Sequence, residues 1–443
     1  MGRKSHSRRL GVWMNGDAVA TWELKGNGAS ELSYDESWLG SVRRRPISLS
    51  MPLRPAADPY RGPLVDAFFD NLLPDTKKIR ERIRSRFHAA STDAFDLLEQ
   101  IGRDCVGALQ LLPEGVQPID VHRIQNAALS ESDVEQILDD CLTPAPQQDY
   151  EDSADTDFRI SLAGAQEKTA LLKLGDSWER PLGPTPTTHI LKLPIGTGNR
   201  GIDLTTSVEN EWLCSRILAA FDIKVANSEI RTFGKHTVLE VERFDREHAA
   251  DDSWIIRLPQ EDFCQVTGTP GSLKYEADGG PGILQIMKLL LGSIASEEDR
   301  ITFMRTQILF WLLCAIDGHA KNFSVFLLPE GRFRLTPSYD VLSAYPVMGT
   351  SNNQLSSQKV KMAMAITGEN RHYRWTEFRR HHWVQTAQKC GLGTRIDELL
   401  DAILAQLPEA LDNAAAQIPT NFPAQVADTI FQGIRESAKK LRT

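Results

Sequence analysis

Cysteine is sparse in this sequence, and no two cysteines stand at the spacing of a redox or zinc motif. Six cysteines are scattered through apolar segments of the 443-residue chain, and none forms a C-x-x-C pair. This distribution excludes a disulfide framework and a cysteine-based zinc site. It indicates reduced, mostly buried thiols in a cytoplasmic protein.

Long apolar runs and an excess of positive charge are also missing. The first residues, MGRKSHSRRLGVW, are basic but lack the apolar run of roughly 7–15 residues that a signal peptide needs. The longest apolar run, residues 308–316, is about half of the ~20 residues that span a bilayer. The net charge of −9 argues against nucleic-acid binding over the whole surface. We therefore expect no membrane partner, and nucleic-acid contact only through a local basic patch.

What is present is an ordinary globular composition, with 41% hydrophobic and 25% charged residues. At roughly 100–200 residues per domain, the length indicates two or three domains. The order of patterns predicts an α+β fold with four regions. These are an N-terminal α+β module (1–115), a helix and acidic linker (116–157), a β-rich lobe with one prominent helix (158–248) and a helical lobe (249–443).

Local patterns predict individual elements within these regions. Asn15-Gly16 supplies the positive φ angles of a type I′ turn, so residues 10–24 are predicted to form a hairpin. Helices are predicted over 207–221, with Ser207 as N-cap, and from Ser296 to residue 317. The other predicted elements are strands at 44–53, 158–162, 168–174, 187–193 and 237–244, and a hairpin that turns at residues 329–331.

The stretch from 316 to 344 carries a pattern typical of phosphoryl transfer. Asp317 and Asn322 are five residues apart in a loop after an apolar helix, and Asp340 follows at the end of the hairpin. Phosphoryl transfer needs a carboxylate for the attacking hydroxyl, and a carboxamide and a second carboxylate for Mg²⁺. The spacing matches the kinase pattern D-x-x-x-x-N. The alternative is a plain turn after a helix, with Asn322 as a loop cap.

An apolar strand upstream offers the cation that such a site requires. Lys192 lies between two leucines, where an unpaired ammonium would be costly. We expect it to face a ligand, with Glu209 or Glu211 of the next helix as partner; the sequence leaves this choice open. The strand that ends in Glu242, Arg243 and Phe244 stands where a kinase meets adenine, although its alternation also fits an ordinary strand.

Two further segments are candidates for phosphate contact. Ala163, Gly164 and Ala165 are small enough to let a phosphate approach the backbone, and Gln166, Glu167 and Lys168 follow, but no Walker A pattern is present. Residues 359–389 hold seven basic and two acidic side chains. This segment is either a solvated helix face or a surface for the phosphate backbone of DNA.

Taken together, the chain resembles the HipA family of toxin kinases over nearly its whole length. The segments that carry the resemblance are WMNG, FFDNLLPD, FDLLEQIGRDCVGAL, DFRISLAGAQEKTALL, TPTTHILKLPIG, VERFDR, RLPQEDFCQ, KYEADGGPGI, DGHAKNFSVF and LTPSYDVLSA. The resemblance implies a two-lobed, phosphatidylinositol-kinase-like fold and a serine/threonine protein kinase that uses ATP and Mg²⁺. In that fold, 158–248 binds the nucleotide and 249–443 is catalytic.

The resemblance also assigns roles to matching residues. Asp317 is implied as the catalytic base, Asn322 and Asp340 as Mg²⁺ ligands, and Ser161 as the autophosphorylation site. The implied ATP contacts are Ala163, Gly164, Ala165, Gln166, Glu167, Lys168, Lys192, Glu242, Arg243, Phe244, His319, Ala320, Lys321, Asn322, Tyr339 and Asp340. DNA contact falls on Arg379, Arg380 and Lys389, although Gln388 and Gly391 occupy the two positions that are basic in the family.

The implied partners are a HipB-like helix-turn-helix antitoxin dimer, operator DNA reached through that complex, and a translation protein such as glutamyl-tRNA synthetase as substrate. The implied outcome is growth arrest, with repression of the protein's own operon. Two alternatives remain open. One is a non-enzymatic corepressor of a DNA complex, and the other is a small-molecule phosphotransferase of the aminoglycoside type.

Overall fold

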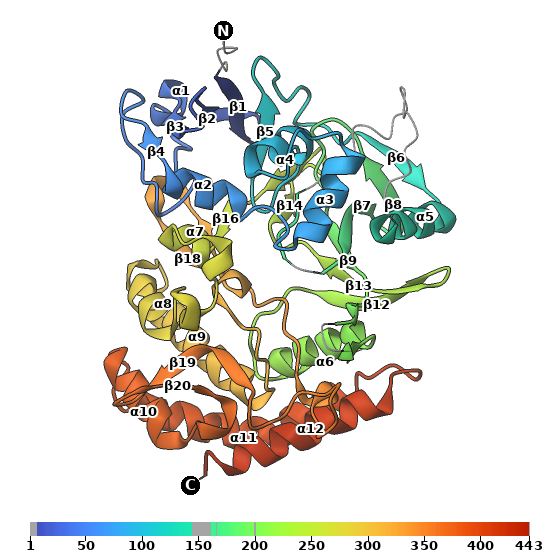
Figure 1. Cartoon of the computed structure of the whole chain (residues 1–443), viewed down its shortest axis with the longest axis vertical. Helices are drawn as coiled ribbons and strands as arrows, with labels where there is room; N and C mark the ends of the chain where they lie inside the picture. The colour runs from blue at the N-terminus through green and yellow to red at the C-terminus, as the bar shows by residue number, and fades with distance from the viewer. Residues whose placement is uncertain (1–6, 144–160, 165, 199–200, 443) are drawn as a thin grey trace.

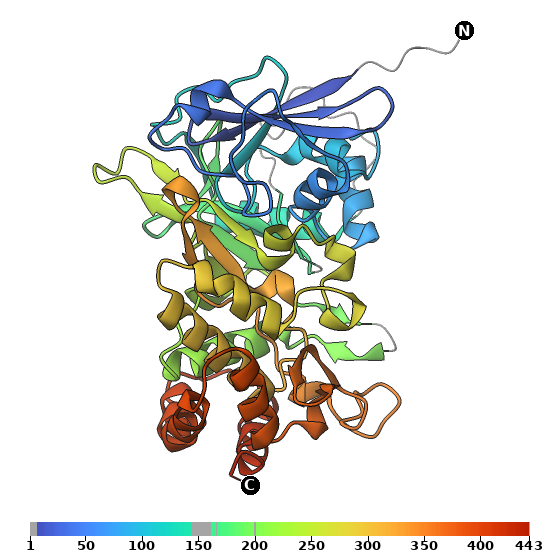
Figure 2. The same cartoon turned by 90° about the vertical axis from the view of Figure 1, so that its left-hand side faces the viewer.

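The computed structural model describes residues 7–143, 161–164, 166–198 and 201–442. The elements follow one another along the long axis of the molecule (Figure 1). An N-terminal sheet with its helices lies at one end, and the C-terminal helices lie at the other. The view turned by 90° shows the same order, with the middle sheet and the helix α9 between the two ends (Figure 2). The mixture of sheets and helices confirms the predicted α+β class.

The N-terminal module, residues 7–115, is built on an antiparallel sheet in the order β4-β3-β2-β1-β5. The predicted hairpin is confirmed: Asn15 and Gly16 join β1 to β2 with φ angles of 48° and 89°. Trp22 of β2 stacks on Phe69 at 3.9 Å between ring centroids, and this contact fixes the helices on one face. The elements are β1 (Arg8–Met14), β2 (Asp17–Leu24), β3 (Ser30–Tyr34), α1 (Glu36–Leu39), β4 (Tyr60–Arg61), α2 (Pro63–Asp70), α3 (Lys77–Arg86), α4 (Ala94–Ile101) and β5 (Leu109–Pro113).

The strand predicted at 44–53 is wrong, because this segment docks on another part of the chain. Only a single bridge joins Ser48 to Met51. The Ser48 hydroxyl donates to Glu261 Oε2 at 2.6 Å, and the Leu49 amide donates to Glu261 Oε1 at 2.7 Å. The Leu49 amide, a group that could have joined a sheet ladder, is therefore satisfied by a side chain instead.

The middle sheet has six strands in the order β12-β13-β9-β7-β8-β6. Helix α5 packs against it through Val134 and Leu138, which join Leu171, Leu191 and Val238 in a small apolar cluster. Its elements are β6 (Asn126–Leu129), α5 (Glu131–Leu142), β7 (Lys168–Leu174), β8 (Ser177–Pro181), β9 (His189–Lys192), β12 (Ser228–Phe233) and β13 (His236–Glu242).

Between β9 and β12 the chain forms β10 (Gly196–Thr197), β11 (Asp203–Leu204) and α6 (Ser207–Ala220). Helix α6 is confirmed, but Thr206 occupies the N-cap position and Ser207 is the first helical residue. Strands β7, β9 and β13 confirm three of the predicted strands. Of the strand predicted at 158–162, residues 158–160 lie outside the described residues, and residues 161 and 162 belong to no strand.

The C-terminal lobe holds the largest apolar core, centred on α9. Here Ala295 is at the N-cap and Ser296 begins the helix. The helices are α7 (Phe263–Thr267), α8 (Ile283–Leu289), α9 (Ser296–Leu312), α10 (Arg380–Lys389), α11 (Arg395–Ala415) and α12 (Ala424–Lys439). The strands are β14 (Arg246–His248), β15 (Ile255–Arg257), β16 (Gln260–Asp262), β17 (Ser324–Leu327), β18 (Phe333–Leu335), β19 (Lys361–Thr367) and β20 (Arg371–Arg374).

Two sequence expectations meet the structure in this lobe, and two others concern all the described residues. The hairpin β17–β18 turns at Pro329–Gly331, as predicted. The basic segment 359–389 is only partly helical, because β19 and β20 pair before α10 begins. All six cysteines are free, and four of them are buried. Within the described ranges, no helix is long and apolar enough to cross a membrane.

A buried ionic network joins the N-terminal module to the rest of the chain. Asp104 accepts from Arg246 at 2.9 Å and from Arg243 and Arg257 at 3.2 Å. Arg243 and Arg246 also pair with Asp245. Burial alone would raise the pKa of Asp104, but the three guanidinium groups outweigh burial and lower this pKa to about 2. The network is therefore fully charged inside the protein.

Removing the Asp104 carboxylate takes the ion-pair partner of the buried Arg257 and one of the two carboxylates that face Arg243 and Arg246, which is strongly destabilising. We expect Asp104→Asn to lower the free energy of unfolding by about 3–5 kcal/mol, as measured by urea denaturation. The control is Asp58→Asn, because Asp58 is exposed and its ion pair with Arg54 spans 3.5 Å; it should change stability by less than about 0.5 kcal/mol. Equal effects of the two substitutions would contradict this account.

Candidate active site

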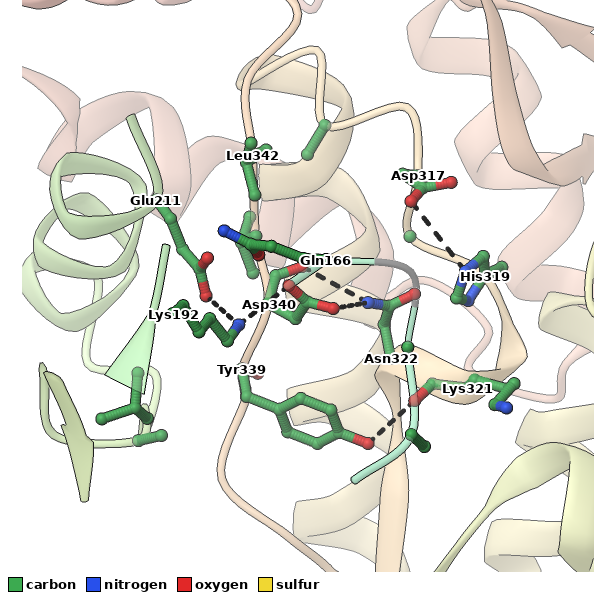
Figure 3. A pocket seen from close by; sticks show the side chains of 18 of the residues that line it. Gln166, Lys192, Glu211, Asp317, His319, Lys321, Asn322, Tyr339, Asp340 and Leu342 are labelled. Carbon is green, nitrogen blue, oxygen red and sulfur yellow. Dashed lines mark hydrogen bonds and ion pairs between the residues drawn. The ribbon is translucent and has the colours of Figure 1, made fainter. Parts of the chain in front are cut away.

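A cavity of about 430 Å³ lies between the middle sheet and the C-terminal lobe. The N-terminal module contributes Asn71, Leu72, Asp75 and Val106 to its walls, and residues between 241 and 274 contribute others. Further walls come from β7 and β9 with the loop before β7, from helix α6, and from the two segments 315–324 and 338–344. Figure 3 shows side chains from these parts converging on one region. Lys192, Asp317, Asn322 and Asp340, which the sequence singled out, all line this cavity.

Lys192 lies at the end of β9, between β13 and β7 in the sheet, and its ammonium is buried. Its Nζ atom is 2.5 Å from Glu211 Oε1 and 3.0 Å from Asp340 Oδ1 (Figure 3). Glu211 is therefore the helix partner that the sequence left open, and Glu209 makes no such pair among the described contacts. Burial would lower the pKa of Lys192, but the two carboxylates outweigh burial and raise it above the ordinary value.

Asp340 and Asn322 meet beside this ion pair. The Asn322 amide donates to Asp340 Oδ2 at 3.1 Å, and Asp340 has a φ angle of 59°, which is uncommon for a residue other than glycine. Burial would raise the pKa of Asp340, but Lys192 and Lys168 outweigh burial and hold it well below the usual range. The carboxylate thus stays charged although it is surrounded by protein.

The same pair offers oxygen ligands to a divalent cation. Asn322 Oδ1 is buried and has no hydrogen-bond partner within the described residues, which is a costly state for a polar atom. Together with the Asp340 carboxylate it provides hard oxygens of the kind that Mg²⁺ accepts. The described part of the chain holds no cluster of three or more histidine, cysteine or carboxylate ligands. The donor set therefore fits an ion that takes its remaining ligands from phosphate and water.

Asp317 follows α9 and stands apart from the ion pair, at the open side of the cavity. The Tyr275 hydroxyl donates to its Oδ1 atom, and His319 Nε2 is 3.9 Å from its Oδ2 atom. Partial burial raises the pKa of Asp317, even though the bond from Tyr275 opposes this rise. Burial lowers the pKa of His319 to about 3, so the imidazole is neutral near pH 7.

The loop before β7 lies across the cavity from Asp317. Gly164 has a φ angle of 109°, a conformation that favours glycine, and the flexible end of the Lys168 side chain lies 2.7 Å from where a Cβ atom would stand. Lys168 donates to the Ala163 carbonyl at 2.7 Å and pairs in register with Lys192 on β9. Burial and the charge of Lys192 lower the pKa of Lys168 to about 8. Ala165, which the sequence placed in this loop, lies outside the described residues.

Two neighbours of this loop are held by other parts of the chain. Gln166 donates to the Leu193 carbonyl at 2.6 Å, and Glu167 forms an ion pair with Arg82 of α3. Ser161 is fully buried: its hydroxyl donates to the Leu72 carbonyl at 2.8 Å, and its amide donates to the Asp104 carbonyl at 3.0 Å. The hydroxyl of Ser161 is therefore closed off by the N-terminal module.

The residues predicted beside adenine have different surroundings. Phe244 lies 5.6 Å from the Tyr339 ring, and both residues line the cavity. Glu242 and Arg243 line the cavity as well, although the Arg243 side chain is held in the buried network with Asp104. Glu242 is exposed and accepts from Asn227 at 3.1 Å.

The remaining sequence candidates divide between the site and its surroundings. Ala320 and Lys321 form a short 3-10 turn with Asn322, and the Tyr339 hydroxyl donates to the Lys321 carbonyl at 3.0 Å. Arg379, Arg380 and Lys389 do not line the cavity. Arg380 pairs with Asp397 and Asp401, and Lys389 donates to the Gly368 carbonyl at 2.5 Å.

Sequence reasoning missed three residues at the edge of the site, namely Asp75, Lys274 and Tyr275. Asp75 forms ion pairs with both Lys274 and Lys321, and Tyr275 bonds to Asp317. The only available signal was that Asp75 and the Lys274–Tyr275 pair stand inside the quoted segments FFDNLLPD and KYEADGGPGI. Local spacing does not show that these segments meet.

Comparisons with known proteins cover nearly the whole chain. The HipA N-terminal domain matches residues 10–112, and the HipA-like C-terminal domain matches residues 160–411. The protein Y4mE of Sinorhizobium fredii is 32% identical, over 92% of this chain and 93% of its own. The serine/threonine-protein kinase toxin HipA of Shewanella oneidensis is 28% identical, over 76% of this chain and 73% of its own.

A solved structure confirms the two-lobed fold. It contains HipA of Shewanella oneidensis with HipB and its operator DNA, and it matches this chain with a TM-score of 0.78 at 20% identity. The match covers 98% of this chain and 97% of that chain. The likeness therefore includes the N-terminal module as well as both lobes around the cavity.

Lys168 gives the stability of the protein a pH dependence. Its pKa falls from 10.5 in the unfolded chain to about 8 in the fold, so between these values the unfolded chain binds more protons and stability rises with pH. Below this window the buried ammonium carries its full cost, on the order of 3 kcal/mol. We expect Lys168→Met to be more stable than the wild type at pH 7, and the difference to shrink toward pH 10.5.

Urea denaturation of both proteins across this pH range measures the effect, with Lys77→Met on the exposed face of α3 as control. Lys77 is exposed, so its substitution should leave the pH profile unchanged. A stability difference between Lys168→Met and wild type that does not vary with pH would refute the assignment.

Proposed function

The chain belongs to the HipA family of kinases, and from this premise we propose that it is an ATP-dependent serine/threonine protein kinase acting as the toxin of a toxin–antitoxin pair. The observation that carries the proposal is the set of Lys192, Glu211, Asn322 and Asp340, joined by direct contacts in one cavity with Asp317 at its open side. A kinase needs this set: a paired cation, two metal ligands and a separate base.

The nucleotide would lie with its phosphates near the two lysines. Lys192 is held in place by Glu211, and Lys168 stands opposite it in the sheet. Gly164 leaves the backbone open on that side. Phe244 and Tyr339, which line the same cavity, offer apolar faces to the adenine. Bound phosphates would supply the negative charge that keeps Lys168 protonated despite its lowered pKa.

Mg²⁺, when bound, neutralises charge on the phosphate oxygens. Asn322 Oδ1 and the Asp340 carboxylate are the protein atoms that would hold it, because one is buried without a partner and the other is kept ionised. Lys192 then shares Asp340 with the ion, so the cation and the metal ligand remain fixed relative to each other.

Asp317 would act on the acceptor. Its carboxylate accepts the proton of the acceptor hydroxyl while that oxygen bonds to the γ-phosphorus, and the bond to the β–γ bridging oxygen breaks to release ADP. The pKa of Asp317 lies above its usual value, which makes the carboxylate a better proton acceptor near neutral pH. The neutral ring of His319 leaves this charge unpaired.

The resemblance to the HipA family and the solved structure of a relative support the partners that we propose. The Shewanella oneidensis HipA was solved with HipB and its operator DNA, and we propose a similar helix-turn-helix antitoxin and operator for this chain. The proposed substrates are a cytoplasmic translation protein, such as an aminoacyl-tRNA synthetase, and Ser161 of the chain itself. Arg379, Arg380 and Lys389 all have partners within the protein, so direct DNA contact would have to compete with these bonds.

The first test is transfer of label from γ-³²P-ATP to protein. Asp317→Asn should lower the transfer rate by about 10²–10⁴-fold, which is the usual contribution of a general base. Asp428→Asn, an exposed change on α12, should leave the rate unchanged. Equal rates for wild type and Asp317→Asn would contradict the proposal, and label found only on a small molecule would favour the aminoglycoside-type alternative.

Ser161 provides a second test. A phosphate adds about −1.5 to −2 charge at pH 7, and an acidic group at this fully buried position loses its hydration, so burial of the loop becomes costly. We expect Ser161→Asp to weaken ATP binding at least tenfold, and Ser161→Ala to retain it, as measured by calorimetry. Ser132→Asp at the exposed start of α5 is the control. ATP binding that is unchanged in Ser161→Asp would rule out the proposed effect.

A further inference from the structure

Asp75, the last residue of the FFDNLLPD segment, touches two different loops of the candidate active site. Its backbone amide donates to the Gly164 carbonyl at 3.0 Å, next to a parallel bridge between Pro74 and Gly164. Its two carboxylate oxygens face two ammonium groups, at 2.7 Å from Lys274 Nζ and 2.8 Å from Lys321 Nζ. One residue of the N-terminal module thus joins the phosphate side of the cavity to its catalytic side.

Each of the two lysines is adjacent in sequence to a residue of the proposed chemistry. Lys321 precedes Asn322, and its ammonium is turned away from the Asn322–Asp340 pair (Figure 3). Lys274 precedes Tyr275, whose hydroxyl donates to Asp317. The Ala320 amide also donates to the Lys274 carbonyl at 3.3 Å. Asp75 therefore holds the turn that carries Asn322 and the segment that orients Asp317.

These contacts are shielded from water, which makes them strong. The Lys321 side chain is 5% exposed, that of Lys274 is 15% exposed and that of Asp75 is 19% exposed. Burial would raise the pKa of Asp75, but Lys321 and Lys274 outweigh burial and lower it to about 2. The carboxylate is charged at every physiological pH, and neither lysine has another carboxylate within ion-pair distance in the described part of the chain.

A purely structural role is the alternative, since other contacts also join the N-terminal module to this region. Asn71 donates to the Thr269 carbonyl at 3.0 Å, and Ser48 bonds to Glu261. Asn71 also lines the cavity, and its carbonyl accepts from Lys321 Nζ at 3.4 Å, but this is one long contact of an uncharged group. Asp75 differs because it is charged and pairs with both lysines, each of which stands beside a reacting group.

We propose that Asp75 is a positioning residue for phosphoryl transfer. Through Lys321 and Lys274 it sets the geometry of Asn322 and Asp317, so the docked N-terminal module is part of the working enzyme. The inference rests on the proposed kinase function. A displacement of about 1 Å at a reacting group costs on the order of 10²-fold in rate, whereas the nucleotide contacts through Lys192 and Phe244 do not pass through Asp75.

The test compares Asp75→Asn with Asp70→Asn in the full-length protein. Asp70 is a matched control because it ends helix α2 in the same FFDNLLPD segment, but its ion pair with Arg80 stays inside the N-terminal module. We expect Asp75→Asn to lower kcat for label transfer at least tenfold while the Kd of ATP changes less than threefold. Asp70→Asn should change neither quantity.

Lys274→Met is a second variant for the case in which Asp75→Asn does not fold. It leaves Asp75 paired with Lys321, so no buried charge loses its only partner, and it should lower kcat at least threefold at unchanged Kd. A kcat equal to that of wild type in both variants, an equal loss in Asp70→Asn, or a loss of kcat matched by the loss of ATP binding would overturn the proposal.

Hydrogen exchange in the absence of ATP separates this inference from the kinase proposal. Backbone amides of residues 319–323 should exchange at least fivefold faster in Asp75→Asn than in wild type or Asp70→Asn. If wild type transfers no phosphate, the kinase proposal fails, and this exchange difference still decides whether Asp75 holds the loop. Unchanged exchange in these amides would refute the inference by itself.

Discussion

The structure depends on the buried ammonium of Lys192 and the two carboxylates that surround it. An unpaired ammonium at the end of a central strand would be too costly to bury, so the fold has to bring Glu211 and Asp340 to it. These residues come from the sheet, from helix α6 and from the segment after β18. The same electrostatic requirement therefore closes the cavity and fixes the Asp340 carboxylate, which we propose as a metal ligand.

A second set of buried charges ties the N-terminal module to this arrangement. Asp104 meets three arginines, and Asp75 meets two lysines. Such contacts lose much of their value when either partner is removed, because the remaining charge stays buried. The module is thus attached through directional ion pairs, which fix one docked position. Apolar contacts alone would allow small shifts of the module.

Much of the site could be predicted from the sequence, because its pattern is local. Asp317, Asn322 and Asp340 stand at recognisable spacing, and Lys192 is conspicuous as a cation in an apolar strand. The choice between Glu209 and Glu211 could not be predicted, since both lie on one helix and only the packing of α6 decides which faces β9. The contacts of Asp75 and Asp104 could not be predicted for another reason. Their charged partners are between 139 and 246 residues away, and no local sequence pattern indicates that such residues lie close together.

The elements of the fold were likewise predictable where the sequence signal is local and not where it depends on distant residues. The hairpin at Asn15-Gly16 and strands β7, β9 and β13 follow from turn chemistry and local periodicity. The strand expected at 44–53 failed because Glu261, far along the chain, takes its hydrogen-bonding groups. The prediction for the basic segment 359–389 used only its content of charged residues, and this content does not distinguish the hairpin β19–β20 from a helix.

The burial of Ser161 has a consequence for timing. A hydroxyl that is fully enclosed and bonded to Leu72 is unreachable by any phosphate donor while the loop is in place. Phosphorylation would then have to wait for the loop to leave by thermal motion, and could only trap a molecule that had already opened. The rate at which phosphorylated molecules accumulate would then equal the rate at which the loop opens. The local stability of the loop would therefore set the time course of the modification.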